Sequence, residues 1–203
     1  MKRTQILFIT GTDTGVGKTV FAALSTVYLR QNGFRVAALK PLCSGGRDDA
    51  RTLHAAAGKV LSLDEVNPWF FRAPLAPLLA ARKEKKRVRL REVVAHIRRI
   101  AKRFEVVVVE GAGGLLSPLG EGFDSRDLIQ ALGAMPIIVC LNKLGAVNQV
   151  RLVLEALPPR AQRNARVVLV NPKKPDAASQ TNLELLKEFV EPDRLRVIPW
   201  IKI

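Results

Sequence analysis

The chain has 203 residues, which is typical of one compact domain, and we expect a single domain over 1–203. Hydrophobic residues make up 48% and charged residues 25%, the ordinary balance of a globular protein. No apolar run approaches the roughly 18 residues of a transmembrane helix, and no signal peptide precedes the first glycine-rich loop. The two cysteines have no metal-ligand spacing and do not indicate an oxidising compartment, so we expect a cytoplasmic protein.

Apolar runs rich in β-branched residues alternate along the chain with helical patterns. Such alternation predicts an α/β fold with a mostly parallel central sheet and helices on both faces. A connection with three prolines, 67–81, is expected to be irregular. The predicted elements are strand 5–10, helix 18–31, strand 35–40, helix 48–57, helix 90–103, strand 105–109, helix 124–132, strand 136–141, helix 146–157, strand 166–170, helix 179–190 and strand 196–199.

A phosphate-binding loop is predicted between the first strand and the first helix. The segment from Gly11 to Thr19 is rich in glycine and ends in Gly-Lys-Thr. Its backbone N–H groups and the first turn of the helix would surround an anion, Lys18 would reach the β- and γ-phosphates, and Thr19 would present a hydroxyl to magnesium. The loop is a variant, because Thr12 stands where the strict pattern has its first glycine. The residues expected to bind ATP here are Thr14, Gly15, Val16, Gly17, Lys18 and Thr19.

Two further segments with charged residues follow predicted strands. Glu110 comes at the end of strand 105–109 and is followed by small residues, and Lys40 closes strand 35–40. Because the carboxyl ends of parallel strands meet at one sheet edge, both side chains are expected beside the phosphate loop. Glu110 is a candidate magnesium ligand and Lys40 a candidate catalytic cation. Asp48 or Asp49 would complete the metal site, or would cap the helix that follows.

The net charge of +15 is concentrated in the run from Arg82 to Arg91, with further cations at 98, 99, 102 and 103. This run predicts either a polyanion-binding patch or a loop and helix face rich in solvated charge, and we favour the second. No aromatic residues are interleaved with the charges, so neither a base-stacking platform nor a nucleic-acid partner is expected.

Taken together, these motifs resemble the dethiobiotin synthetases. The resemblance extends in order through most of the chain, and three of its segments are more specific than the phosphate loop: those beginning at Lys40, at Glu110 and at Lys143. One departure is Gly15, where family members often carry a glutamate. The matching segments are 11–19, 40–44, 49–50, 66–68, 73–77, 109–114, 118–119, 143–148, 171 and 198–200.

The resemblance implies an ATP-dependent cyclo-ligase of biotin biosynthesis. An amine of 7,8-diaminononanoate takes up CO2 as a carbamate, the carbamate attacks the γ-phosphate of ATP, and the second amine displaces phosphate to close the ureido ring. By this resemblance the magnesium ligands are Thr19, Asp49 and Glu110. Lys18 and Lys40 would stabilise the reacting anions, and Ser44 would contact the substrate.

The resemblance also assigns two more distant groups of residues. Adenine would be bound by Asn171 together with Pro199, Trp200 and Ile201. The substrate carboxylate would be received across a homodimer interface at the start of the helix after Lys143. The resemblance assigns Gly145, Ala146 and Asn148 to the carboxylate; the small residues after Glu110, namely Gly111, Ala112 and Gly113, would approach the γ-phosphate or the substrate with their backbone amides.

Three alternatives are weighed against this assignment. A nucleotide-switch ATPase of the ParA/MinD type would bind DNA or membrane through the basic surface, but its signature lysine is replaced here by Asp13. An amide-forming synthetase of cobalamin assembly is expected to carry an additional glutaminase domain, for which 203 residues leave no room. A nucleotide-binding protein without turnover would not need Lys18, Thr19, Lys40 and Glu110 together.

Overall fold

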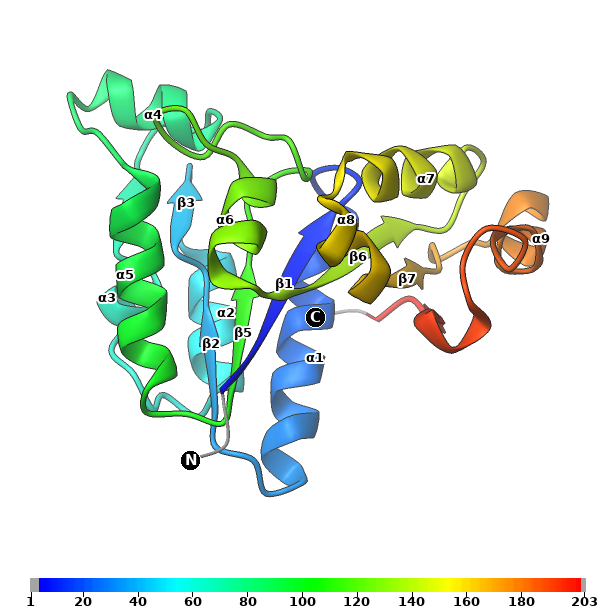
Figure 1. Cartoon of the computed structure of the whole chain (residues 1–203), viewed down its shortest axis with the longest axis horizontal. Coiled ribbons are helices and arrows are strands. Elements are labelled where there is room, and N and C mark those ends of the chain that lie inside the picture. Colours follow the sequence, from blue (N-terminus) through cyan, green and yellow to red (C-terminus); the bar gives the residue numbers. More distant parts are fainter. Residues whose placement is uncertain (1–3, 202–203) are drawn as a thin grey trace.

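The computed structural model describes residues 4–201, and its centre is a single parallel sheet with the strand order β2-β5-β1-β6-β7-β8 (Figure 1). Each neighbouring pair of these strands is parallel, which confirms the predicted α/β class. The carboxyl ends of β1, β2 and β5 therefore meet at one edge of the sheet. The strands are β1 (Gln5–Gly11), β2 (Val36–Leu39), β5 (Val106–Glu110), β6 (Met135–Leu141), β7 (Arg166–Val170) and β8 (Leu195–Ile198).

Alternate side chains of the strands pack into two separate cores. Phe8 and Val107 face one core, in which Ile97 is fully buried, whereas Ile9 and Val108 face the other. Helices therefore cover both faces of the sheet, as predicted (Figure 1). The helices are α1 (Lys18–Gln31), α2 (Asp48–Ala56), α3 (Leu63–Val66), α4 (Pro77–Lys83), α5 (Leu90–Ala101), α6 (Ser125–Leu132), α7 (Ala146–Ala156), α8 (Pro159–Asn164) and α9 (Ala177–Leu186), with a 3-10 turn η1 (Pro192–Arg194).

The expectation of an irregular connection at 67–81 is wrong at 69–71 and 77–81 and holds at 72–76. The segment contains β4 (Trp69–Phe71), which pairs in parallel with β3 (Leu42–Ser44) in a two-stranded sheet, and α4 begins at Pro77. The strands are too short to show a period in the sequence, and the proline at the first position of α4 suits a helix start. Buried Asn67 ties this layer to the main sheet, because its Nδ2 donates to the Lys40 carbonyl at 2.8 Å.

The last third of the chain differs from the prediction in two places. The helix α8 was not predicted, because its six residues carry little periodic signal. The helix α9 begins at Ala177 and ends at Leu186, earlier at both ends than the predicted 179–190. Asp176 sets its start, since the carboxylate accepts a hydrogen bond from the Ser179 N–H at 2.7 Å.

The basic run lies on the connection between α4 and α5. Arg82 makes a bidentate contact with Glu121, at 3.0 and 2.9 Å, and Lys86 pairs with Glu84 at 2.8 Å. Part of the run is therefore neutralised within the chain, and the other cations are exposed, as expected for a solvated basic surface. None of the helices formed by residues 4–201 combines the length and the apolar composition that crossing a bilayer requires.

Candidate active site

The phosphate loop joins β1 directly to α1, as the sequence predicts. Gly15 and Gly17 have φ values of 73° and 98°, in the left-handed region that favours glycine. A Cβ on Gly17 would also lie 3.2 Å from the side chain of Val170, at the end of β7. Lys18 lies under the loop and donates to the Asp13 carbonyl at 2.7 Å. The loop is thus already curved around the ammonium group that would meet the phosphates.

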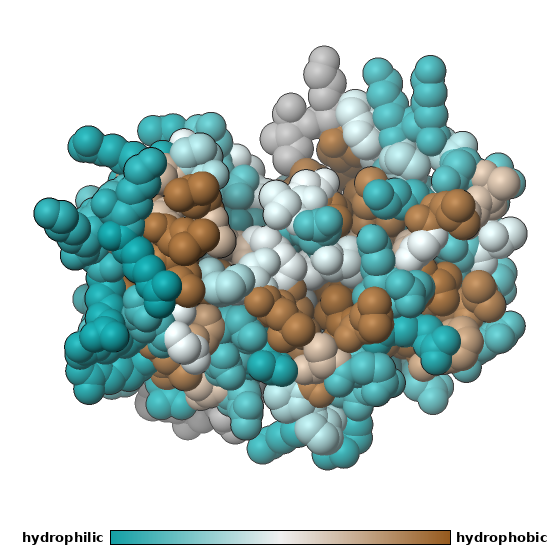
Figure 2. Space-filling model, turned by 90° about the horizontal axis from the view of Figure 1, so that it is seen from above, coloured by the Kyte–Doolittle hydropathy of each residue, from teal (hydrophilic) through white to brown (hydrophobic). Residues whose placement is uncertain are grey.

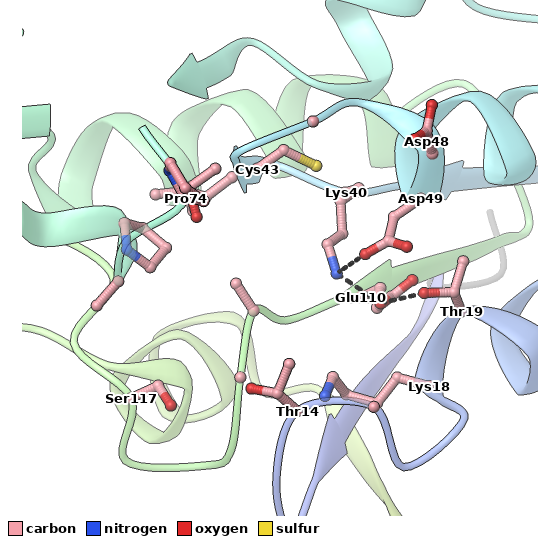
Figure 3. Close-up of a pocket in the computed structure, with 18 of the residues that line it drawn as sticks. Thr14, Lys18, Thr19, Lys40, Cys43, Asp48, Asp49, Pro74, Glu110 and Ser117 are labelled. Carbon is pink, nitrogen blue, oxygen red and sulfur yellow. Dashed lines mark hydrogen bonds and ion pairs between the residues drawn. The ribbon is translucent and has the colours of Figure 1, made fainter. Parts of the chain in front are cut away.

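A buried ion cluster lies beside this loop (Figure 3). The Lys40 Nζ is 2.5 Å from Glu110 Oε1 and 3.0 Å from Asp49 Oδ2, and it also donates to the Gly111 carbonyl at 3.0 Å. Thr19 Oγ1 donates to the same Glu110 oxygen at 2.9 Å. Side chains from the ends of β2 and β5 and the starts of α1 and α2 therefore converge on one point.

The cluster keeps Lys40 charged although its side chain is only 5% exposed. Burial disfavours the ammonium, but the carboxylates of Glu110 and Asp49 outweigh burial and raise the pKa of Lys40. Burial likewise opposes ionisation of Asp49, and the neighbouring Lys40 outweighs it and lowers the pKa of that carboxyl. At neutral pH the site holds a fixed cation that cannot act as a base.

The two adjacent aspartates both lie in the first turn of α2, but their side chains point in different directions. Asp49 points to Lys40, whereas the Asp48 side chain is 89% exposed and pairs with Arg51 at 2.8 Å. Neither caps the helix by its side chain, because Arg47 occupies the N-cap position and makes no side-chain cap hydrogen bond. The alternative that one of them caps α2 is therefore wrong, and Asp49 is the one directed at the ion cluster.

The donors at this point suit a hard divalent cation. The second Glu110 oxygen, Oε2, is buried and has no hydrogen-bond partner within residues 4–201. It lies on the carboxylate that already contacts the Thr19 hydroxyl, and Asp49 contributes a second carboxylate. Within the described part of the chain no group of three or more His, Cys, Asp or Glu residues could hold a metal. A magnesium ion would therefore share these few ligands with phosphate and water, as Mg²⁺ usually does.

A cavity of about 830 Å³ opens over the loop and the ion cluster, a volume within the range of small-molecule sites. Its lining is polar at the phosphate loop and the ion cluster and apolar at Leu42, Cys43 and the segment 74–77. The predicted site residues that line it are Thr14, Gly15, Gly17, Lys18, Thr19, Lys40, Ser44, Asp49, Glu110, Ala112 and Gly113.

The cavity also contains residues for which the sequence indicated no role. Ser117 lines it, and its Oγ accepts a hydrogen bond from the Gly114 N–H at 2.9 Å, which closes the loop after β5. Thr52 lines it from α2, Leu75 from the segment before α4, and Pro77 from the first position of α4. The Pro-Leu-Ala-Pro motif at 74–77 was the available signal for that wall, and Ser117 has no comparable signal because it lies in a loop.

Nine predicted residues do not line this cavity. Val16 packs under Gly11, and Gly111 is buried below the loop after β5. Asn171 follows β7, next to the Val170 that touches the phosphate loop. The others are Pro199, Trp200 and Ile201, which are exposed after β8, and Gly145, Ala146 and Asn148, which begin α7.

Gly111 is expected to tolerate no side chain. A Cβ there would lie 2.8 Å from Ser125 Oγ and 3.1 Å from the Phe8 ring, and the Gly111 carbonyl accepts from Lys40. Gly111→Ala should therefore displace the loop after β5 and lower kcat at least about tenfold, by analogy with small displacements of catalytic groups. Gly122→Ala is the control in steady-state assays, because a Cβ there meets nothing within 4 Å; its φ of 72° should cost stability but leave kcat unchanged. Equal activity of both variants would contradict the expectation.

Comparison with known proteins agrees with this geometry. The model of an AAA-domain family matches residues 5–203. The ATP-dependent dethiobiotin synthetase of Anaeromyxobacter dehalogenans is 40% identical over 96% of this chain and 89% of its own length. Those of Akkermansia muciniphila and Bacillus subtilis are 38% and 34% identical, over 89% and 95% of this chain and 85% and 86% of their own lengths. The chain belongs to the dethiobiotin synthetase family.

Solved structures show that the chain shares its fold with a ParA family ATPase and with a chain of the MinC:MinD cell division complex. A ParA family ATPase from Chlorobium tepidum superposes with a TM-score of 0.61 at 14% identity, over 98% of this chain and 86% of its own. A chain of the MinC:MinD cell division protein complex from Aquifex aeolicus superposes with a TM-score of 0.54 at 17% identity, over 97% of this chain and 81% of its own. At these identities the likeness shows the fold alone. It does not favour the switch-ATPase alternative over the family shown by the sequence relatives.

Proposed function

We propose that this protein catalyses the ATP-dependent closure of the ureido ring of dethiobiotin from 7,8-diaminononanoate and CO2. The observation that carries the proposal is the buried Lys40 cation, held by Glu110 and Asp49 at the wall of a cavity that also contains the phosphate loop. A carbamate and a triphosphate are both anions. A reaction between them requires fixed positive charge placed between the two.

The chemical step follows from that requirement. An oxygen of the substrate carbamate attacks the γ-phosphorus, and ADP leaves with the electrons of the broken P–O bond. The second amine then attacks the carbonyl carbon of the carbamic-phosphoric anhydride, phosphate leaves with the C–O bond electrons, and the amine loses its proton. Lys18 and Lys40 stabilise the charge that accumulates on the transferring group. Ser44, which lines the cavity, orients the carbamate.

Magnesium would be held by Thr19, Asp49 and Glu110, and when bound it supplies further charge neutralisation at the phosphates. The unpartnered Glu110 Oε2 supports this assignment. Lys40 now contacts the same carboxylates, so that metal and ammonium would share them. Because Glu110 ends β5 next to Thr19 and Asp49 lies in the first turn of α2 beside it, the two carboxylates can hold both cations close to the phosphates.

The nucleotide base is proposed to lie on the other side of the phosphate loop from the ion cluster. Asn171 follows β7, and its N–H donates to the Ile198 carbonyl at 2.9 Å, which brings the segment 199–201 beside it. Trp200 is 43% exposed, with the Lys173 ammonium 5.6 Å from its ring centroid. Asn171 would hydrogen-bond the base, and Pro199, Trp200 and Ile201 would pack against it.

A homodimer is proposed to complete the substrate site. Gly145, Ala146 and Asn148 lie at the N-terminal end of α7, where the positive end of the helix dipole suits a carboxylate from the partner's site; the Ala146 N–H itself donates to the Lys143 carbonyl at 3.0 Å. Leu144 beside it is 81% exposed, and Leu79 and Leu116 are each 51% exposed. Figure 2 shows hydrophobic side chains across the middle of this face, with hydrophilic ones along the side where α4 and α5 lie. A second subunit would cover the apolar area.

ATP binding is expected to take up a proton at alkaline pH. Burial, and then the nearby Lys40, lower the pKa of Lys18 to about 8, so part of the free protein lacks this cation above that pH. The triphosphate favours the ammonium, so the affinity for ATP should be full well below pH 8 and should fall as the pH rises through 8. At pH 8 about half a proton should be bound per ATP. Calorimetry in buffers of different ionisation enthalpy measures this uptake, and an equal uptake by Lys18→Met would contradict the assignment.

The proposed function is tested by the stoichiometry of the purified protein with Mg²⁺, ATP and bicarbonate. Phosphate release should depend on 7,8-diaminononanoate, with one dethiobiotin formed per phosphate. ATP hydrolysis that ignores the diamine and instead responds to DNA or lipid vesicles would move the switch-ATPase alternative to first place.

A further inference from the structure

Three asparagines from separate segments form a connected set of hydrogen bonds beside the phosphate loop. Asn142 follows β6, Asn171 follows β7 and Asn182 lies on α9. The Asn182 Nδ2 donates to the Lys143 carbonyl at 3.0 Å and to Asn142 Oδ1 at 2.9 Å. The Asn142 Nδ2 donates to the Ser179 carbonyl at 2.8 Å and to Asn171 Oδ1 at 2.7 Å.

The direction of each amide in this set is determined by a backbone carbonyl. Asn182 faces the Lys143 carbonyl and Asn142 faces the Ser179 carbonyl, and a carbonyl can only accept. The nitrogen of each amide must therefore be the atom beside its carbonyl. Asn142 then presents its second N–H to Asn171, so the Asn171 atom that receives it must be the oxygen. The usual ambiguity between amide oxygen and nitrogen is removed by these contacts.

The two buried asparagines, Asn142 and Asn182, hold the side chain of the less buried Asn171 in place. Asn142 and Asn182 are 1% and 6% exposed, and burying such amides is favourable only when their polar atoms are paired. Asn171 at the end of the series is half-buried, and residues 4–201 provide no hydrogen-bond partner for its Nδ2. The neighbouring Val170 touches the phosphate loop at Gly17, so this nitrogen lies close to where a bound nucleotide would extend.

We propose that Asn142 and Asn182 are positioning residues that fix the Asn171 amide with its nitrogen toward the nucleotide base. The Asn171 Nδ2 would then donate a hydrogen bond to purine N7, an acceptor that adenine has and a pyrimidine lacks. The inference rests on the proposed placement of the base beside Asn171. It adds the buried pair that sets the direction of the reading group, which no motif of the sequence indicated.

The test is binding of MgATP and of its 7-deaza analogue, which has carbon in place of N7, measured by calorimetry without the diamine. The wild-type protein should bind the analogue about tenfold more weakly, the effect of one lost hydrogen bond. Asn182→Leu should weaken MgATP binding about tenfold and leave binding of the analogue nearly unchanged, so that the two affinities converge. Asn142→Asp, which cannot donate to Asn171, should also remove the preference. Gln180→Leu makes the same amide-to-leucine change at an exposed position of α9 and should keep it.

A kinetic split separates positioning from loss of structure. Asn182→Leu should raise the KM for ATP about tenfold while kcat stays within about twofold, and Asn182→Leu combined with Asn171→Ala should cost no more than Asn171→Ala alone. If Asn182→Leu fails to fold, Asn182→Ser takes its place. Equal affinity of the wild type for the two nucleotides would overturn the inference, as would a preserved preference in Asn182→Leu and Asn142→Asp. Absence of dethiobiotin formation would instead refute the proposed function, because the binding measurement does not depend on it.

Discussion

Lys40→Met is expected to lower kcat for dethiobiotin formation by about 10²–10³-fold, with the Kd for ATP changed less than about threefold. Methionine keeps much of the side-chain length and removes the charge. The ammonium is 2.5 and 3.0 Å from two carboxylates at the cavity wall, where the transferring phosphoryl group gains charge. The Lys40 ammonium should therefore stabilise the transition state more than it stabilises bound ATP. Single-turnover kinetics at saturating magnesium and direct ATP binding give the two quantities.

The matched control for this variant is Lys83→Met, an exposed lysine at the end of α4. It should retain wild-type turnover. Thermal unfolding of Lys40→Met shows whether the unneutralised Glu110 and Asp49 destabilise the fold. A raised Kd for ATP with unchanged kcat would make Lys40 a ground-state nucleotide contact and would contradict its catalytic role.

Lys18→Ala should abolish ATP turnover, a loss of about 10³-fold or more, while leaving the fold intact. Lys18 is 6% exposed, and its ammonium donates to the Asp13 carbonyl in the loop that would receive the phosphates. Removing it therefore takes away a cation needed at the β- and γ-phosphates and breaks one hydrogen bond within the protein. Phosphate release and circular dichroism measure the two effects. Lys102→Ala, an exposed change after α5, is the control, and turnover by Lys18→Ala comparable to wild type would remove the phosphate loop from the mechanism.

The long elements of the fold could be predicted because their burial is written directly into the sequence. The run Val106–Val109 is apolar without alternation, and the structure buries it on both faces in β5. The three-residue strands β3 and β4 and the short helix α8 could not be predicted in this way. The two strands form through contacts between distant segments, such as Leu42 with Trp69, and the helix is too short to show a period in the sequence.

The centre of the candidate site was also predictable, because parallel strands bring their carboxyl ends together. Lys40 and Glu110 were placed by this rule, and the structure has them in direct contact beside Thr19. The choice between Asp48 and Asp49 required the direction of the first turn of α2, which only the structure gives. The supporting pair Asn142 and Asn182 was not predictable, since neutral amides leave no pattern of charge or period.

The most direct test of the central claim is the fate of oxygen from labelled bicarbonate. With ¹⁸O-bicarbonate, ATP and 7,8-diaminononanoate, the carbamate oxygen that attacks the γ-phosphorus should leave with phosphate when the ring closes. The account predicts one ¹⁸O in each phosphate formed together with dethiobiotin, after correction for exchange of bicarbonate with water, as measured by mass spectrometry. Dethiobiotin formed with unlabelled phosphate would show that the carbamate never bonded to the γ-phosphorus and would contradict the proposed mechanism.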